Sequence, residues 1–230
     1  SSQLDMDRMD YLNRDCFFTG VAEGAIGSER IIKMFDVVDD QLVIESKGIL
    51  SIENFLNARR LMYWQVYLHK TSICAEVMLI QAIKRARELA MSGDSIFASP
   101  DFSLFLNNTV TLQQFKEDPL YLQSFIQIDD YDVWACLKTW AKHSDFVLST
   151  ICQQLLDRKL YKIQFSEQPF DQNYLQQIHQ KLRKQGISDG WHSYFLVMGE
   201  SSNAAYVSSK ENILIKMKDG SVCDIANASD

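Results

Sequence analysis

Two groups of polar and aromatic residues combine the spacing of a helix face with the chemistry of a phosphate site. The first group is Asp7, Tyr11 and Asp15, which stand at i, i+4 and i+8 and share one stripe of a helix, with Arg8 beside them. Carboxylates are hard oxygen ligands for divalent metals, and Arg and Tyr side chains bind phosphate oxygens. Spacing alone leaves open a solvated helix face with i,i+4 polar pairs.

The second group is Arg59, Tyr63, Tyr67 and Lys70, at i, i+4, i+8 and i+11 of a longer helix. This cationic and aromatic face suits a nucleotide, because rings stack on a base or sugar and cations pair with phosphates. The alternative is an amphipathic helix whose tyrosines pack in the core while Arg59 and Lys70 extend their charged ends to solvent.

Helical patterns carry both groups and dominate up to about residue 165. Helices are expected over 5–15, 29–34, 51–67, 72–91, 111–116, 121–128, 130–141, 144–158 and 171–185, with Ser51 capping the third. Short strands are expected on both sides of Asp39-Asp40 and over 160–165, 194–198, 213–217 and 221–225. The sequence therefore predicts a mainly α protein, with a helical part over 1–165 and a small α+β subdomain over 166–230.

Composition and charge exclude several classes of protein. Apolar residues make up 47% and charged residues 23% of the 230 residues, as in ordinary globular proteins. The net charge of -7 provides no global basic field, so neither nucleic acid nor an anionic membrane is an expected partner. Five widely spaced cysteines without a C-x-x-C motif indicate reduced thiols in a cytoplasmic protein. No apolar run approaches the roughly 18 residues that would span a bilayer.

Motifs that would carry catalysis by themselves are missing from the sequence. The four histidines have no H-x-x-x-H or H-E-x-x-H spacing, and His179 and His192 are expected at the surface. There is no Walker loop, G-x-S-x-G elbow or G-x-G-x-x-G motif, and no catalytic residue is identified in this chain. The N-terminus lacks a signal peptide and an initiator Met, so we expect the interior of a longer protein.

Three ordered blocks resemble one enzyme family. The string DMDRMDYLNRDCFFTG at residues 5–20 is similar to the last helix of the metal-binding core in HD-superfamily phosphohydrolases. The blocks RRLMYWQVYLHK at 59–70 and LLDRKLYK at 155–162 follow in the family's order. The resemblance covers about residues 5 to 165 and is to the deoxynucleoside-triphosphate triphosphohydrolase, or dGTPase-like, branch.

The resemblance implies a metal-dependent enzyme that hydrolyses deoxynucleoside triphosphates to deoxynucleoside and triphosphate. Its cofactor would be one divalent metal ion (Mg, Mn, Fe, Ni and Zn are not distinguished), and Asp7 matches the final aspartate of the ligand set. The family's other ligands include a His-Asp pair, and this chain has no His-Asp dipeptide. It looks like the C-terminal part of such an enzyme without the upstream half, so we expect this chain alone to be inactive.

The same matching implies two sets of nucleotide-binding residues. The substrate set is Arg8, Tyr11, Asp15, Arg59, Tyr63 and Tyr67. The regulatory set is Arg30, Lys47, Lys70, Arg158 and Lys162, which match basic residues between subunits of nucleotide-activated homo-oligomers. The resemblance therefore implies a nucleotide effector and a dimer or tetramer, and the alternative for the second set is ordinary surface cations.

Two rival functions remain open on the sequence. The chain could be a non-catalytic nucleotide-sensing or oligomerisation module, since half of the metal site is missing. It could also be part of an HD phosphohydrolase with another nucleotide or phosphomonoester as its substrate.

Overall fold

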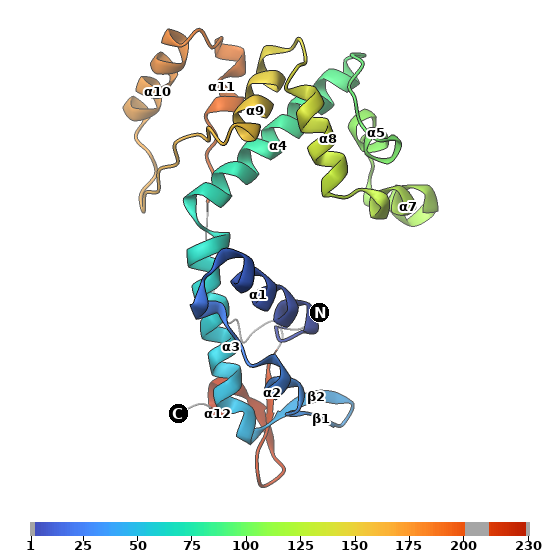
Figure 1. Ribbon diagram of the computed structural model, residues 1–230, viewed down its shortest axis with the longest axis vertical. Helices are drawn as coiled ribbons and strands as arrows, with labels where there is room; N and C mark the ends of the chain where they lie inside the picture. The colour runs from blue at the N-terminus through green and yellow to red at the C-terminus, as the bar shows by residue number, and fades with distance from the viewer. Residues whose placement is uncertain (1–2, 201–211, 229–230) are drawn as a thin grey trace. The chain divides into compact units, whose positions relative to one another are not determined.

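The computed structural model describes residues 3–200 and 212–228, and these are mainly helical with one small sheet (Figure 1). The prediction of a mainly α fold with a small α+β part is therefore confirmed. The α-helices are α1 Met6–Thr19, α2 Ser28–Ile32, α3 Ile49–Met62, α4 Lys70–Met91, α5 Pro100–Asn107, α6 Leu112–Glu117, α7 Pro119–Gln127, α8 Asp130–Trp140, α9 Phe146–Leu156, α10 Gln172–Lys184, α11 His192–Phe195 and α12 Ile225–Ala228. Shorter helical turns are η1 Ala22–Gly24, η2 Ser46–Gly48, η3 Tyr63–Tyr67 and η4 Asp189–Trp191.

The chain divides into two compact units. Unit 1 consists of residues 1–69 and 200–230, and unit 2 of residues 70–199. The predicted boundary near residue 165 lies inside unit 2. The division differs because the C-terminal strands pair with a strand from the N-terminal part of the chain, which places both ends in one unit.

Unit 1 is built on a four-stranded sheet in the order β1-β2-β3-β4. The strands are β1 Phe35–Val38, β2 Gln41–Glu45, β3 Leu214–Lys216 and β4 Val222–Asp224. Asp39 and Asp40 turn between β1 and β2 with φ of 50° and 60°, the conformation that a tight hairpin requires. β2 and β3 are parallel, with Ile44 opposite Ile215. These isoleucines are buried with Leu12 of α1 and Phe55 of α3, so the core of unit 1 joins the sheet to both helices.

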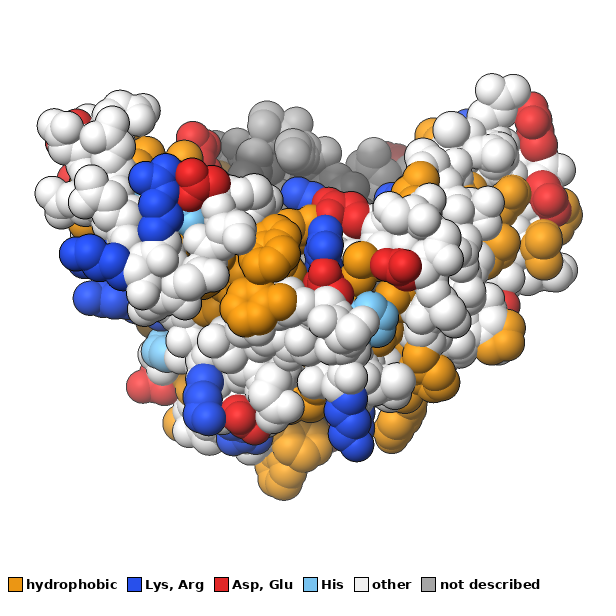
Figure 2. All heavy atoms as spheres, turned by 90° about the horizontal axis from the view of Figure 1, so that it is seen from above, with side chains coloured by type: hydrophobic (Ala, Val, Ile, Leu, Met, Phe, Trp, Pro, Cys, Tyr) orange, Lys and Arg blue, Asp and Glu red, His pale blue; other side chains and the backbone are white. Residues whose placement is uncertain are grey.

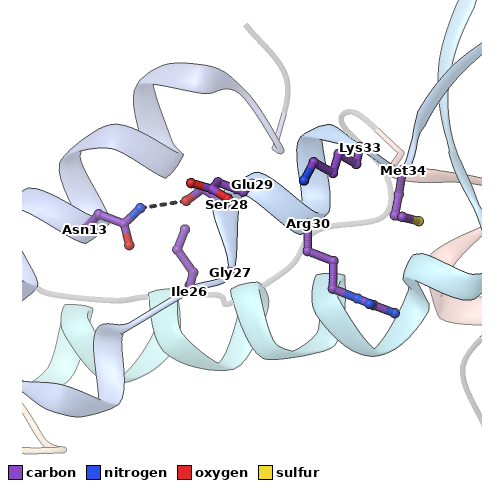
Figure 3. Close-up of a pocket in the computed structure, with 8 residues that line it drawn as sticks. All are labelled: Asn13, Ile26, Gly27, Ser28, Glu29, Arg30, Lys33 and Met34. Carbon is purple, nitrogen blue, oxygen red and sulfur yellow. Dashed lines mark hydrogen bonds between the residues drawn. The ribbon is translucent and has the colours of Figure 1, made fainter.

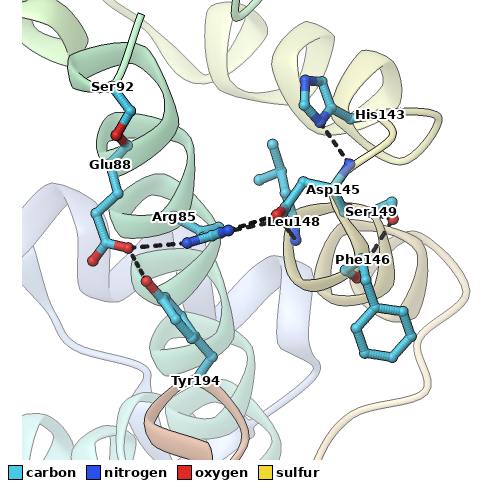
Figure 4. A network of polar contacts seen from close by, with 9 residues as sticks. All are labelled: Arg85, Glu88, Ser92, His143, Asp145, Phe146, Leu148, Ser149 and Tyr194. Carbon is cyan, nitrogen blue, oxygen red and sulfur yellow. Dashed lines mark hydrogen bonds and ion pairs between the residues drawn. The ribbon is translucent and has the colours of Figure 1, made fainter. Parts of the chain in front are cut away.

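Unit 2 is a helical assembly around α4. Helix α9 packs on α4, and α8 packs on α9, around buried Met78, Trp140 and Ile151. Arg85 of α4 donates to both carboxylate oxygens of Asp145, at 3.1 and 2.6 Å. Glu88 lies beside Arg85 and accepts a hydrogen bond from the hydroxyl of Tyr194 (Figure 4). This network connects α4 to the start of α9 and to α11.

The two ends of unit 2 differ in surface chemistry. Leu120, Phe125 and Ile126 of α7 are exposed hydrophobic side chains. The end of unit 2 that carries α7 shows hydrophobic and acidic side chains on the same face (Figure 2). Helix α10 has basic residues in its last turn. None of the helices within residues 3–200 and 212–228 has the length and apolar character that crossing a bilayer requires.

Two predicted strands are wrong. Residues 160–165 are irregular, because the backbone N–H of Tyr161 donates to the Met78 sulfur instead of to a partner strand. Residues 194–198 begin in α11 and continue without strand structure. In both segments the alternation of residue types reflects packing against helices, since Tyr161 and Phe195 both contact the core of unit 2.

Three local predictions also need correction. The helix expected from Ser51 begins two residues earlier, at Ile49, and the Ser51 hydroxyl accepts a hydrogen bond from Arg30 instead of capping the helix. Helix α5 was not predicted, although Ser99 at the N-cap and Pro100 in the first turn are a helix-start signal. His192 is buried, with its Nδ1 2.8 Å from Nδ1 of His179, whereas both histidines were expected at the surface.

Candidate functional site

Helix α1 presents the first group of site residues on one face. The carboxylate of Asp5 caps the helix by accepting from the backbone N–H of Arg8, and Gly20 ends it in a left-handed conformation with φ of 73°. Met9 and Leu12 are buried in unit 1. The predicted i, i+4, i+8 stripe therefore exists, with Asp7 exposed and the others half-buried.

The second group does not lie on one continuous helix, as the spacing predicted. Arg59 is on α3, Tyr63 and Tyr67 are on a π-helical turn, and Lys70 begins α4 after a break at Leu68 and His69. Residues Tyr63–Tyr67 form η3, in which the backbone N–H of Leu68 donates to the carbonyl of Tyr63 at 2.7 Å. Such wider turns are often found at functional sites. The hydroxyl of Tyr67 donates to Oδ2 of Asp15 at 2.6 Å, which joins the two predicted groups.

Three tyrosine rings form the wall of the site. The rings of Tyr11 and Tyr67 meet edge to face with centroids 5.9 Å apart, and those of Tyr63 and Tyr67 do so at 5.2 Å. Burial and the nearby Tyr63 raise the pKa of Tyr11, although the cation of Arg59 opposes the shift. Burial, together with the hydrogen bond to Asp15, raises the pKa of Tyr67 well above its usual range. Both phenols therefore remain protonated hydrogen-bond donors at neutral pH.

Arg59 stands out in this arrangement. Its guanidinium lies 5.7 Å from the centre of the Tyr63 ring, in cation–π contact. Its Nε and Nη1 atoms are buried and have no hydrogen-bond partner among residues 3–200 and 212–228. Buried guanidinium nitrogens almost always find an acceptor, so these two donors are suited to an anion that enters the site.

The described residues do not form a metal site by themselves. Asp7 is an exposed carboxylate on α1, and residues 3–200 and 212–228 contain no group of three or more His, Cys, Asp or Glu side chains placed to hold a metal ion. One carboxylate is too few for a structural or catalytic divalent metal. The donors present thus do not fit a complete metal centre.

The predicted regulatory residues are distributed over both units. In unit 1, Arg30 donates to the Ser51 hydroxyl at 3.1 Å and to the backbone carbonyl of Lys47 at 3.4 Å, while the Lys47 ammonium is paired with the Glu45 carboxylate. In unit 2, Lys70 lies 5.9 Å from the centre of the Phe165 ring. Arg158 and Lys162 are exposed.

Arg30 also lines a hollow of about 640 Å³ in unit 1 (Figure 3). Asn13 of α1 forms part of its wall and donates to the Ser28 hydroxyl at 2.6 Å. The sequence reasoning missed Asn13 and Lys33 as lining residues. The i, i+3 spacing of Arg30 and Lys33 on the predicted helix over 29–34 could have indicated that Lys33 lies on the same face. No sequence pattern could have indicated Asn13, because its position depends on how α1 packs against α2.

Comparisons with known proteins agree with this architecture. Residues 26–115 match the family described as the HD associated region. The chain is 31% identical over 207 residues to the uncharacterized protein YwfO of Bacillus subtilis, covering 90% of this chain and 45% of that protein. It is 27% identical over 101 residues to the deoxynucleoside triphosphate triphosphohydrolase SAMHD1 homolog of Dictyostelium discoideum, covering 44% of this chain and 20% of that protein.

A solved structure gives the same result. The crystal structure of a phosphohydrolase from Bacteroides thetaiotaomicron matches with a TM-score of 0.89 and 50% identity, over 100% of this chain and 57% of that one. The chain thus spans about half the length of the Bacillus subtilis protein and of the Bacteroides thetaiotaomicron phosphohydrolase. The chain is therefore similar to HD-superfamily phosphohydrolases, and its residues 26–115 match the HD associated region.

Proposed function

We propose that unit 1 binds the substrate of an HD phosphohydrolase that converts a deoxynucleoside triphosphate into a deoxynucleoside and triphosphate. Because the chain spans about half of its relatives, this activity is proposed for the intact protein. The resemblance of residues 5–20, 59–70 and 155–162 to the dGTPase-like branch supports this choice of substrate.

The observation that carries the proposal is the state of Arg59. Its Nε and Nη1 atoms are buried donors without acceptors, beside a wall of tyrosine rings. A triphosphate oxygen would supply the missing acceptor, and a charged partner is expected because hydrogen bonds between guanidinium and phosphate are strong. A sugar or base would meet the ring edges of Tyr11 and Tyr63.

In this reaction a water molecule adds to the α-phosphorus, the bond from that phosphorus to the 5′ oxygen breaks, and a proton is transferred to the leaving oxygen. Arg59 and Arg8 would neutralise the charge that develops on the phosphates. Tyr67, oriented by its hydrogen bond to Asp15, and Tyr11 would position the nucleotide. No general acid for the leaving oxygen is assigned to this chain.

We propose one divalent metal ion as the cofactor of the intact enzyme. Asp7 would contribute one ligand, and the remaining ligands would come from outside the residues described here, since these hold no metal cluster.

We also propose that Arg30, Lys47, Lys70, Arg158 and Lys162 bind a nucleotide effector in a homo-oligomer. In unit 1 the exposed side chain of Arg30 supports this, because a guanidinium pairs strongly with phosphate oxygens, whereas the Lys47 ammonium would have to leave Glu45.

The test is hydrolysis by the full-length protein. Each of the four deoxynucleoside triphosphates is incubated with the protein and Mg²⁺ or Mn²⁺, and the products are separated by ion-exchange chromatography. We expect triphosphate and deoxynucleoside, no turnover with Asp7→Asn, and a loss of about 100-fold in kcat/KM with Arg59→Gln. Arg60→Gln is the matched control, because Arg60 is the exposed neighbour of Arg59, and we expect it to retain activity.

Other products would reject the proposal. Release of a monophosphate or pyrophosphate would contradict the reaction, and turnover of only other nucleotides or phosphomonoesters would contradict the substrate. Nucleotide-dependent assembly without any turnover would instead favour a nucleotide-sensing module.

A further inference from the structure

Unit 2 contains a second hollow that the proposed function does not use. It has a volume of about 470 Å³ and lies where the loop around Phe97 meets the end of α8. Its polar lining includes Lys138, Lys142 and His143, together with the Ser95 hydroxyl. Hollows of a few hundred Å³ have the size of small-molecule sites.

The charged side chains that line this hollow are cationic, and none is acidic. Lys138 and Lys142 are exposed and make no ion pair with the described residues, and no Asp or Glu lines the hollow. The nearest acidic residue in sequence to His143 is Asp145. Its carboxylate is held by Arg85 at 2.6 Å, so it does not neutralise the lysines.

His143 has a defined hydrogen-bonding role. Its Nδ1 accepts a hydrogen bond from the backbone N–H of Asp145 at 3.0 Å. In the neutral imidazole the proton must therefore be on Nε2, which is a donor. Figure 4 shows that the other ring nitrogen points away from the Asp145 network.

The end of α8 does not oppose an anion as strongly as an open helix terminus would. The carbonyls of Leu137, Thr139 and Trp140 already accept backbone N–H groups from residues 141–143. The backbone carbonyl of Phe97 accepts a hydrogen bond from the Trp140 indole at 2.8 Å, while Phe97 as a residue is 52% exposed. The hollow thus combines three cationic or N–H donors with a positioned aromatic residue.

We propose that this hollow binds a small phosphorylated molecule that carries an aromatic ring, such as a nucleoside monophosphate. Lys138, Lys142 and Nε2–H of His143 hold the phosphate, and the Phe97 ring stacks on the attached base. The site is in unit 2, it shares no residue with the substrate or regulatory sets above, and it does not depend on their function.

The first test uses pyrophosphate and AMP as probes on the chain as it stands. Arg59→Gln serves as the background, so that the unit 1 site does not contribute to binding. The imidazole signals of His143 are followed by NMR at fixed ionic strength and assigned with His143→Gln. We expect both probes to shift these signals saturably, and Lys138→Gln/Lys142→Gln to weaken both affinities by about tenfold or more.

Two controls make the result decisive. Lys116→Gln/Lys181→Gln removes the same charge from exposed positions of unit 2 and is expected to change either affinity less than about twofold, because distant charges are screened. Phe97→Ala is expected to weaken the affinity for AMP and to leave the affinity for pyrophosphate unchanged. The proposal is overturned if His143 does not respond or if the control double variant loses as much affinity. If Phe97→Ala weakens the affinity for both probes equally, or for neither, the proposed stacking of Phe97 on the base is rejected.

Discussion

Two guanidinium nitrogens of Arg59 are buried and find no acceptor in the part of the chain that the structure describes, and a buried donor in that state costs about 1–3 kcal/mol. The folded chain keeps this donor beside Tyr63 instead of pairing it with a carboxylate. The carboxylate of Asp15 accepts a hydrogen bond from Tyr67 on the same wall of tyrosine rings. Arg59 therefore has the properties of a residue retained for binding at the expense of stability.

We predict that Arg59→Met raises the free energy of unfolding by about 1 kcal/mol, because it removes unpaired donors and keeps an apolar side chain of similar length. Urea denaturation of the two proteins measures the difference. Arg60→Met, at the exposed neighbouring position, should change stability by less than about 0.5 kcal/mol. A destabilisation by Arg59→Met would show that the guanidinium supports the fold.

Residue spacing predicted much of this site. The i, i+4, i+8 patterns placed Asp7, Tyr11 and Asp15 on one face of α1 as the structure has them. The hydrogen bond from Tyr67 to Asp15 joins residues 52 positions apart, and no helical period specifies it. The unpaired state of Arg59 was also beyond prediction, because it depends on which groups fail to reach it after packing.

At the scale of elements, η1 approaches α1 and α3 through a glycine. A Cβ atom on Gly24 would lie 2.5 Å from Cγ and Sδ of Met62 and 2.7 Å from Sγ of Cys16. Met62 is fully buried, so its side chain has little room to move away. This contact brings the loop after α1 against the helix that carries Arg59.

We predict that Gly24→Ala destabilises unit 1 by about 1–3 kcal/mol through overpacking. Thermal unfolding followed by circular dichroism measures the effect. Gly190→Ala is the matched control and should be close to neutral, because a Cβ there has no heavy atom within 4 Å. Equal stability of the two variants would mean that Met62 repacks freely.

Element prediction succeeded where a local signal was complete. The strands around Asp39-Asp40 and the hairpin around Lys218-Asp219-Gly220 both exist, because the turn residues specify both arms. Residues 160–165 alternate like a strand but lack a neighbouring strand to pair with, and Tyr161 instead packs against α4. Alternation of polar and apolar residues shows which side chains are buried. Whether the backbone forms a strand depends on a neighbouring strand with which it can pair.

At the scale of the whole chain, unit 1 is closed by residues from both of its ends. Ile215 of β3 is fully buried opposite Ile44 of β2, in parallel pairing across a long sequence separation. Lys216 donates to the Asp36 carboxylate at 2.6 Å, which joins β3 to β1. All of unit 2 lies between β2 and β3 in sequence, and it has its own core.

We predict that Ile215→Ala destabilises unit 1 by about 2–5 kcal/mol through the cavity it leaves. Hydrogen exchange should show lower protection of the backbone amides in β2 and unchanged protection in α9. Ile151→Ala, at a fully buried position of α9, should give the reverse pattern. Loss of protection in both units with either variant would show that they unfold as one.

The sequence by itself determined the helical class, most helix positions, both hairpins and the faces on which the candidate site residues lie. These features follow from residue type and from periods of two or 3.6 residues, which act over short separations. The tertiary structure alone decided that both chain ends share one sheet, that Tyr67 meets Asp15 and that Arg59 lacks an acceptor. It also decided the burial of His192 and the hollow beside His143, because these depend on which distant surfaces come into contact.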